Sequence, residues 1–169
     1  AFFVAEGEGF RLRWFTPKTE VNLCGHATLA TAHVLFAHLG YGRPEVVFAT
    51  RSGPLVVARA GDALVMDFPA REALACGPSS ALSAALGAMP LELLASDVYL
   101  AVFADEDEIR AMCPESGLLC ALDKRAVIVT APGREVDFVS RYFAPKMGVP
   151  EDPVTGSAHC VLTPYWARR

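Results

Sequence analysis

The first part of the chain alternates between short apolar runs and one stretch of helical periodicity. Apolar residues dominate positions 2–6 and 10–15, and Gly7-Glu8-Gly9 between them predicts two strands joined by a turn. Across positions 26–39 the apolar residues recur at helical spacing, and Gly40 supplies a stop, so we expect a helix there. Three further strands are expected over 46–49, 55–58 and 64–68.

The rest of the chain predicts short helices mixed with strands. Residues 69–78 contain several Pro, Ala and Gly residues and form a candidate linker, so we divide the chain into halves at 1–72 and 73–169. Residues 16–22 and 144–155 are expected to be loops, and a final helix is expected from Gly156 onward. The remaining helices are predicted over 80–86, 105–112 and 116–122, and the remaining strands over 98–103, 126–130 and 136–143.

A repeat within the chain relates the two halves. The sequence Arg-Trp-Phe-Thr-Pro-Lys-Thr-Glu-Val at 13–21 returns as Arg-Tyr-Phe-Ala-Pro-Lys-Met-Gly-Val at 141–149, an offset of 128 positions. Each copy leads into a glycine that is expected to begin a helix, Gly25 and Gly156, now 131 positions apart. The pattern predicts two duplicated, domain-sized halves rather than a solenoid. Two full periods need about 256 residues, so we expect the chain to be a fragment whose first half lacks its beginning and whose second half lacks its end.

Composition and charge narrow the classes of function. Hydrophobic residues make up 53% of the chain, and the formal net charge is −4 without a run of Lys and Arg, which argues against nucleic acid as a partner. No apolar run approaches the roughly 18 to 20 residues of a membrane span. The five cysteines are irregularly spaced, which is untypical of a disulfide framework or a zinc site and indicates a reducing cytoplasm.

The candidate chemistry lies at the two glycine turns. Backbone N–H groups at the start of a helix lack partners and carry partial positive charge, so they bind carboxylates and stabilise oxyanions. If the halves are related by a pseudo-twofold axis, the two helix starts can face each other across one cleft. His26 follows the first glycine and titrates near neutrality, while Asp152 precedes the second glycine and Ser157 follows it.

Each candidate also has an ordinary structural interpretation. A single glycine turn is usually a capped helix, and a lone histidine such as His26 is more often a surface or core residue. Glu151 and Asp152 are equally consistent with a solvated loop, and Ser157 with a cap or a substrate contact. The chain has no G-x-S-x-G motif, phosphate-binding loop or dinucleotide fingerprint.

Two motifs carry a family resemblance. Phe-Thr-Pro at 15–17 together with Asn-Leu-Cys-Gly-His-Ala-Thr at 22–28 resembles the first signature of the PhzF-like family, which is named for phenazine biosynthesis. Glu-Asp-Pro-Val-Thr-Gly-Ser-Ala-His-Cys at 151–160 resembles the second, more specific signature. Residues 66–70 and 127–133 also look like that family, so the resemblance spans nearly the whole chain.

The resemblance implies an α+β fold like that of diaminopimelate epimerase, with two pseudo-symmetric domains, each a curled, mostly antiparallel sheet around a central helix. It further implies a cleft between the domains, a homodimer and a small-molecule carboxylate substrate. In the family's characterised isomerase, a glutamate moves a proton between carbons of a dihydro-hydroxyanthranilate. By resemblance, His26 and Asp152 would assist proton transfer, and Gly25, Gly156 and Ser157 would bind polar groups of the substrate. Neither a metal nor an organic cofactor is needed.

One departure from the family keeps alternatives open. The family's catalytic glutamate would lie just before Ala1, and Glu6 and Glu8 belong to a turn, so the role is not transferred to them. One alternative is a non-catalytic small-molecule-binding protein of the same fold. Another is a two-cysteine racemase or epimerase using Cys24, although the position expected for its second thiol holds Pro153 or Val154.

Overall fold

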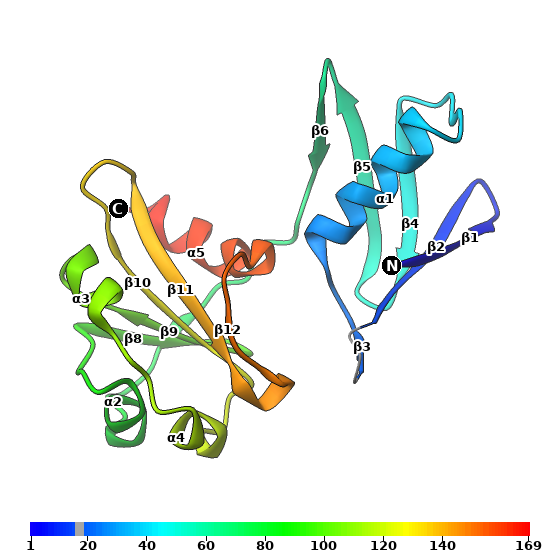
Figure 1. The fold of residues 1–169 in the computed structure, drawn as a ribbon. Coiled ribbons are helices and arrows are strands. Elements are labelled where there is room, and N and C mark those ends of the chain that lie inside the picture. Colours follow the sequence, from blue (N-terminus) through cyan, green and yellow to red (C-terminus); the bar gives the residue numbers. More distant parts are fainter. Residues whose placement is uncertain (16–18) are drawn as a thin grey trace. The chain divides into compact units, whose positions relative to one another are not determined.

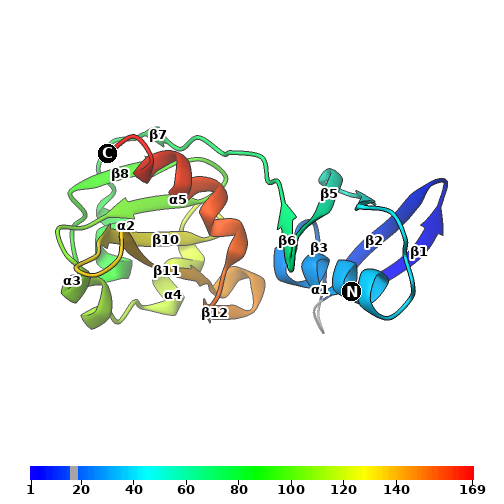
Figure 2. The same ribbon diagram turned by 90° about the horizontal axis from the view of Figure 1, so that it is seen from above.

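A computed structural model describes residues 1–15 and 19–169, and the described chain forms two compact units, Ala1–Pro69 and Ala70–Arg169. Each unit consists of a sheet with its own helices (Figures 1 and 2). The α+β class expected from the sequence is therefore confirmed. Our division into duplicated halves at 1–72 and 73–169 stays a prediction, because compactness does not test duplication.

The first unit is a mixed sheet with one helix. Within the described residues its strands follow the order β1-β2-β4-β5-β6, and β3 pairs with β2. Every strand pair is antiparallel except β2 with β4, which is parallel. The elements are β1 (Phe2–Glu6), β2 (Gly9–Phe15), β3 (Glu20–Val21), α1 (Gly25–Ala37), β4 (Glu45–Thr50), β5 (Gly53–Ala60) and β6 (Ala63–Met66).

Alternation along β2 decides which face of this sheet is covered. Leu12 and Trp14 point to the buried face, whereas Arg11, Arg13 and Phe15 point to the other face and stay exposed. Because successive strand residues face opposite sides, the buried set meets α1, whose Ala32 and Leu35 join the same core as Val46 and Phe48 of β4. This packing fixes the start of α1 relative to the sheet.

Two buried threonines on α1 keep this core free of unpaired hydroxyl groups. Thr28 donates to the carbonyl oxygen of Cys24 at 2.8 Å, and Thr31 donates to that of Ala27 at 2.8 Å. A buried hydroxyl without a partner would cost free energy, so the bonds back to the preceding turn allow both side chains to face the core.

The second unit is a mixed sheet with helices on both faces. Within the described residues the strand order is β12-β11-β10-β9-β8-β7, and β9 with β10 is the parallel pair. Its elements are β7 (Leu74–Ala75), α2 (Ser80–Leu86), β8 (Glu92–Ala95), β9 (Tyr99–Val102), α3 (Glu106–Ala111), α4 (Ser116–Ala121), β10 (Val127–Pro132), β11 (Phe138–Ala144), η1 (Pro145–Met147), β12 (Val149–Asp152), η2 (Gly156–Ala158) and α5 (His159–Trp166).

Two apolar clusters bury both faces of this sheet. On one face α2, α3 and α4 pack against Val127, Val129 and Phe143. On the other face α5 packs against Leu100 and Ile128, and Figure 2 shows α5 lying along the sheet. This double coverage explains why positions 127–131 form a continuous buried run rather than an alternating one.

Four short strands were missed by the sequence-based assignment. Our prediction of loops over 16–22 and 144–155 was wrong where β3 and β12 occur, and the predicted linker contains β7; residues 16–18 lie outside the described residues. No strand was assigned at β8 either. These segments are two to four residues long, and β12 also contains Pro150, which cannot donate a ladder hydrogen bond. Segments this short contain too few residues to show the alternating pattern that indicates a strand.

We predict that Gly9→Ala destabilises the first unit. A Cβ atom at Gly9 would overlap the backbone carbonyl oxygen of Val47 in the neighbouring strand, and a backbone atom in a sheet cannot move aside cheaply. Overpacking of this kind costs about 1–3 kcal/mol, measurable as a lower urea midpoint. Gly42→Ala is the matched control, because a Cβ there meets nothing within 4 Å among the described residues. Equal stability of both variants would contradict the close approach of β2 and β4.

Candidate functional site

The first glycine turn opens α1. Cys24 is the N-cap and has extended backbone, but its side chain makes no capping hydrogen bond among the described residues. Gly25 is buried, and a Cβ there would lie 2.9 Å from Cζ of Phe68. His26 is exposed, with its two ring nitrogens 3.6 and 3.8 Å from Sγ of Cys24. The turn thus places a thiol and an imidazole beside the uncapped start of a helix.

The second glycine turn follows β12 and opens η2 and α5. Asp152 ends β12, and its Oδ1 accepts a hydrogen bond from the backbone N–H of Val154 at 3.2 Å. Thr155 is the N-cap of η2 and makes no side-chain cap among the described residues. Gly156 is exposed, and a Cβ there would meet nothing within 4 Å in the described part of the chain. Ser157 lies inside η2, next to that open backbone.

Both turns differ from the starts of α2, α3 and α4 in how their N–H groups are satisfied. The side chains of Ser79, Asp105 and Glu115 accept backbone hydrogen bonds at the starts of α2, α3 and α4. No such side-chain acceptor, and no acidic residue in the first turn, occurs at Gly25 or Gly156 within residues 1–15 and 19–169. Their N–H groups and the positive end of the helix dipole are therefore available to an anion.

A cavity of about 230 Å³ lies at the second turn. Its lining includes Asp152 and Gly156 together with Arg141, Tyr142, Glu151 and His159. The structure therefore brings two predicted site residues, Asp152 and Gly156, into the lining of one cavity. Ser157 follows Gly156 in the chain. His26 and Gly25 lie together in the first unit, at the other turn.

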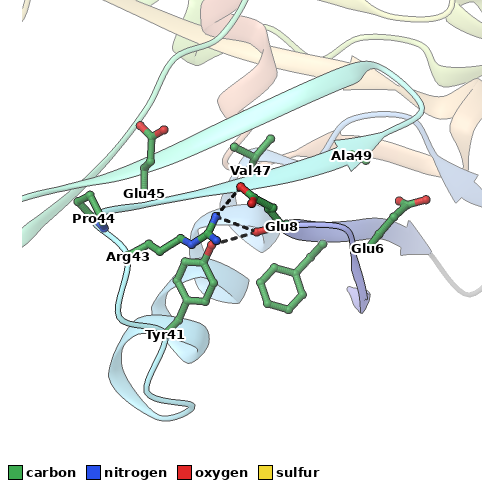
Figure 3. A pocket seen from close by; sticks show the side chains of 10 residues that line it. Glu6, Glu8, Tyr41, Arg43, Pro44, Glu45, Val47 and Ala49 are labelled. Carbon is green, nitrogen blue, oxygen red and sulfur yellow. Dashed lines mark hydrogen bonds and ion pairs between the residues drawn. The ribbon is translucent and has the colours of Figure 1, made fainter.

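A larger cavity, of about 600 Å³, lies beside the β1–β2 turn and contains none of the predicted site residues (Figure 3). Glu6, Glu8 and Glu45 line it, and its Arg43 is already engaged by Glu8, with Nη1 3.2 Å from Oε2. Tyr41 donates to the carbonyl oxygen of Glu8 at 3.5 Å. Three carboxylates and one paired arginine disfavour an anionic substrate, so we do not assign substrate binding to this cavity.

Sequence analysis missed two matching ion pairs beside the turns. Nε and Nη2 of Arg13 donate to Oε1 and Oε2 of Glu20, both at 2.8 Å. Nε and Nη2 of Arg141 donate to Oε1 and Oε2 of Glu151 at 2.7 and 2.8 Å. Glu151 is exposed, as the solvated interpretation held, but it lies in β12 rather than in a loop, and its carboxylate accepts two hydrogen bonds from Arg141. The available signal was the arginine that begins both copies of the repeat.

The ion pairs shift the pKa values of their members. The hydrogen bonds from Arg13 lower the pKa of Glu20, and those from Arg141 lower the pKa of Glu151. In return, the carboxylates raise the pKa values of Arg13 and Arg141. All four groups are therefore charged at neutral pH.

Two further groups near the second turn have altered pKa values. Burial raises the pKa of Tyr142, so its hydroxyl stays neutral at physiological pH within the cavity lining. Burial also raises the pKa of the Cys160 thiol, which disfavours the thiolate. Cys160 is therefore a poor nucleophile or base in this setting.

The described part of the chain contains neither a group of metal-ligating side chains nor a membrane-spanning helix. Within 1–15 and 19–169, no three His, Cys, Asp or Glu side chains are grouped so that they could hold a metal ion. In the same part of the chain, no helix combines the length and the apolar character required to cross a membrane.

Comparison with known proteins identifies the family. The family described as Phenazine biosynthesis-like protein, PhzC-PhzF, matches residues 1–169. Crystal structures of PhzF-family proteins from Enterococcus faecalis (TM-score 0.90, 44% identity) and Clostridium difficile (TM-score 0.87, 39% identity) each cover 99% of this chain. The chain therefore belongs to the PhzC-PhzF family, as the motifs predicted.

The relatives are longer than this chain. A Pseudomonas aeruginosa protein named as an uncharacterized isomerase is 53% identical over 169 residues, which is all of this chain and 65% of that protein. The chain likewise spans 65% of the Enterococcus faecalis structure and 64% of the Clostridium difficile structure. It thus covers just under two thirds of the relatives it matches.

We predict that the stabilising effect of Glu151 disappears in acid. Because the pKa of Glu151 in the folded protein is below its usual 4.5, the contribution is complete above that value and is lost as pH falls through the folded pKa. Glu151→Gln should therefore lower the free energy of unfolding at about pH 7. The difference from the parent protein should disappear as the pH falls below the folded pKa of Glu151. Urea unfolding across this range measures the difference. Glu135→Gln, at an exposed glutamate outside the ion pairs of the described residues, is the control and should show no such convergence.

Proposed function

We propose that the protein is an isomerase of the PhzF type, independent of metal and organic cofactors, which shifts a proton between carbons of a small cyclic or amino carboxylate. The observation that carries the proposal is the pair of uncapped glycine turns, each with a titratable side chain, His26 or Asp152, close to free backbone N–H groups. Membership of a family with relatives named as isomerases supports the reaction class.

The proposed reaction breaks one C–H bond and forms another without a change in oxidation state. A base takes a proton from a carbon close to the carboxylate, and the electron pair left behind delocalises toward the carboxylate as an enolate. An acid then returns a proton to a different carbon. Unpaired N–H groups aimed at the developing negative charge lower the barrier, because they need no reorganisation when that charge appears.

Each site residue has a role in this scheme. His26 and Asp152 assist proton transfer and hold the substrate, since both carry groups that exchange protons reversibly. Gly25 and Gly156 offer backbone N–H groups to substrate oxygens, and the Ser157 hydroxyl, which has no hydrogen-bond partner among the described residues, adds a donor beside Gly156. The burial of Cys160 argues against a two-thiol racemase that would pair this thiol with Cys24.

The same resemblance supports finer expectations for the whole protein. We extend the proposal to a diaminopimelate epimerase-like architecture with each sheet curled around its central helix, to a homodimer and to a cytoplasmic location. A small carboxylate is the proposed partner, and neither nucleic acid nor a membrane is included. Light scattering on the purified protein would test the homodimer.

Substitution of the titratable residues tests the proposal. In D₂O, with a dihydro-hydroxyanthranilate as probe, the protein should transfer deuterium to carbon, and Asp152→Asn or His26→Gln should slow this by about 10²- to 10⁴-fold. Asp137→Asn and His33→Gln are matched controls at exposed positions away from the turns. If the probe and amino carboxylates bind but none of their carbon-bound hydrogens exchanges with deuterium, the protein is a non-catalytic binding protein instead. Loss of exchange on alkylation of Cys24 would favour the thiol mechanism.

The two glycines are expected to respond differently to alanine. Gly156→Ala should leave the unfolding midpoint unchanged, because a Cβ there meets no described atom within 4 Å, yet it should obstruct approach to the N–H groups. We expect kcat/KM to fall about 10- to 100-fold, less than loss of a donor itself. Gly25→Ala should also lower stability, because its Cβ would press on the Phe68 ring. Unchanged kinetics for Gly156→Ala would rule out substrate contact at that backbone.

A further inference from the structure

The same three-residue arrangement occurs once in each unit. Besides its two bonds to Glu20, Arg13 places its guanidinium carbon 4.9 Å from the centre of the Phe15 ring. Arg141 repeats this geometry in the other unit, 4.9 Å from the Phe143 ring. We call each set of arginine, glutamate and phenylalanine a clamp. Bidentate pairing and ring stacking both require the planar guanidinium of arginine.

The clamps join equivalent points of the two sheets. In β2 and β3, Trp14 lies opposite Val21, and in β11 and β12, Tyr142 lies opposite Asp152. These partners are the positions next to the clamp arginine and next to the clamp glutamate. Both clamps therefore lock the outgoing strand to the returning strand with the same pairing at this point, although the register of β11 with β12 shifts between Tyr142 and Ala144. No sequence identity links Val21 to Asp152.

The loop between the clamp arginine and the clamp glutamate differs in length between the two units, whereas the spacing from the glutamate to the glycine does not. The arginine and glutamate are seven positions apart in the first clamp and ten in the second, so the three-residue difference between the repeats falls inside the clamped loop. From the glutamate onward the two copies run in step, and the glycine follows five positions later in both. The clamp thus separates the variable loop from the invariant spacing to the turn.

Additional contacts anchor each clamp to its unit. Nη1 of Arg141 donates to the carbonyl oxygens of Ile109 at 2.9 Å and Met112 at 2.7 Å, at the end of α3. Oε2 of Glu20 lies 2.9 Å from Nη2 of Arg51, and only 11% of the Glu20 side chain is exposed. The charges are therefore held by neighbouring elements rather than by each other alone, which limits the freedom of the returning strand.

We propose that Arg13 and Arg141 are positioning residues, which hold the two glycine turns in the conformation that receives the substrate. The inference rests on the proposed function only in assigning substrate binding to those turns. Each arginine acts through its glutamate, which fixes the returning strand and hence the backbone five positions later. In the second unit the returning strand is β12, which ends at Asp152. The clamp of Arg141 and Glu151 therefore also sets the position of the Asp152 carboxylate.

Amide hydrogen exchange tests the clamp without any substrate. Arg141→Lys keeps the charge but cannot pair bidentately or stack as a plane, so exchange over 152–158 should become about tenfold faster or more, while β10 amides stay protected. Arg13→Lys should do the same over 21–28. Arg11→Lys is the matched control: Arg11 also pairs bidentately, with Glu6 across the β1–β2 hairpin, but the repeat places Val139 at its counterpart.

A second variant guards against simple misfolding. Glu151→Gln removes the pair while leaving the Arg141 bonds to α3 available, and it should mobilise the same amides. The double variant should add little to either single change, because both remove one interaction. Unchanged exchange at the turns, or an equal rise in β10 and in the Arg11→Lys control, would overturn the proposal.

Kinetics with the dihydro-hydroxyanthranilate separate positioning from general stability. At a temperature where both proteins are fully folded, Arg141→Lys should lower kcat by about 10- to 100-fold, as a misplaced catalytic group does, with KM changed by less than about threefold. An unaltered kcat despite mobile turns would overturn the positioning role. Absence of turnover in the parent protein with this probe and with amino carboxylates would count against the proposed function instead, and the exchange experiment would still decide whether the clamps hold the turns.

Discussion

The pairing of a strand with the short strand that returns beside it is the constraint on which each unit depends. The position of the backbone at each glycine is set by one strand pairing in each unit. Trp14 lies opposite Val21 in the first unit, and Tyr142 lies opposite Asp152 in the second. A slip of one residue in such a ladder would turn every following side chain to the other face. The position of the helix start, the orientation of its N–H groups and the reach of the neighbouring titratable group all follow from that register.

The two units share this frame but place different chemistry on it. With the later offset of 131 positions, His26 corresponds to Ser157 and Val21 corresponds to Asp152. An imidazole therefore stands just inside one helix start, whereas a carboxylate stands just before the other. Both units thus hold the parts that position backbone, namely the clamp and the glycine, while the side chains beside them differ. Such a division suits a reaction in which one group gives a proton and another takes it.

The helix starts that bear the candidate chemistry are electrostatically unlike those of α2, α3 and α4. Ser79, Asp105 and Glu115 satisfy the first N–H groups of α2, α3 and α4, so those helices are closed to an anion. At Gly25 and Gly156 no described side chain caps the helix start by accepting a backbone hydrogen bond. Leaving the groups unpaired forgoes a stabilising cap. Since η1 also begins without a side-chain cap among the described residues, it is this contrast together with the repeat that singles out the two turns.

The sequence by itself determined the elements with strong periodicity, the positions of the two turns and the family. Apolar runs on either side of a glycine turn identified β1 and β2, and the repeat located Gly25 and Gly156. Helical spacing identified α1, because burial of one face imposes a regular period on local sequence. Only the tertiary structure decided that β3 and β12 are strands, that Glu151 is paired with Arg141, and that three helices are capped while the turns are not. These features depend on the backbone and side-chain conformations that the folded chain adopts, and a short strand with Pro150 and two acidic residues carries no periodicity that records its partner.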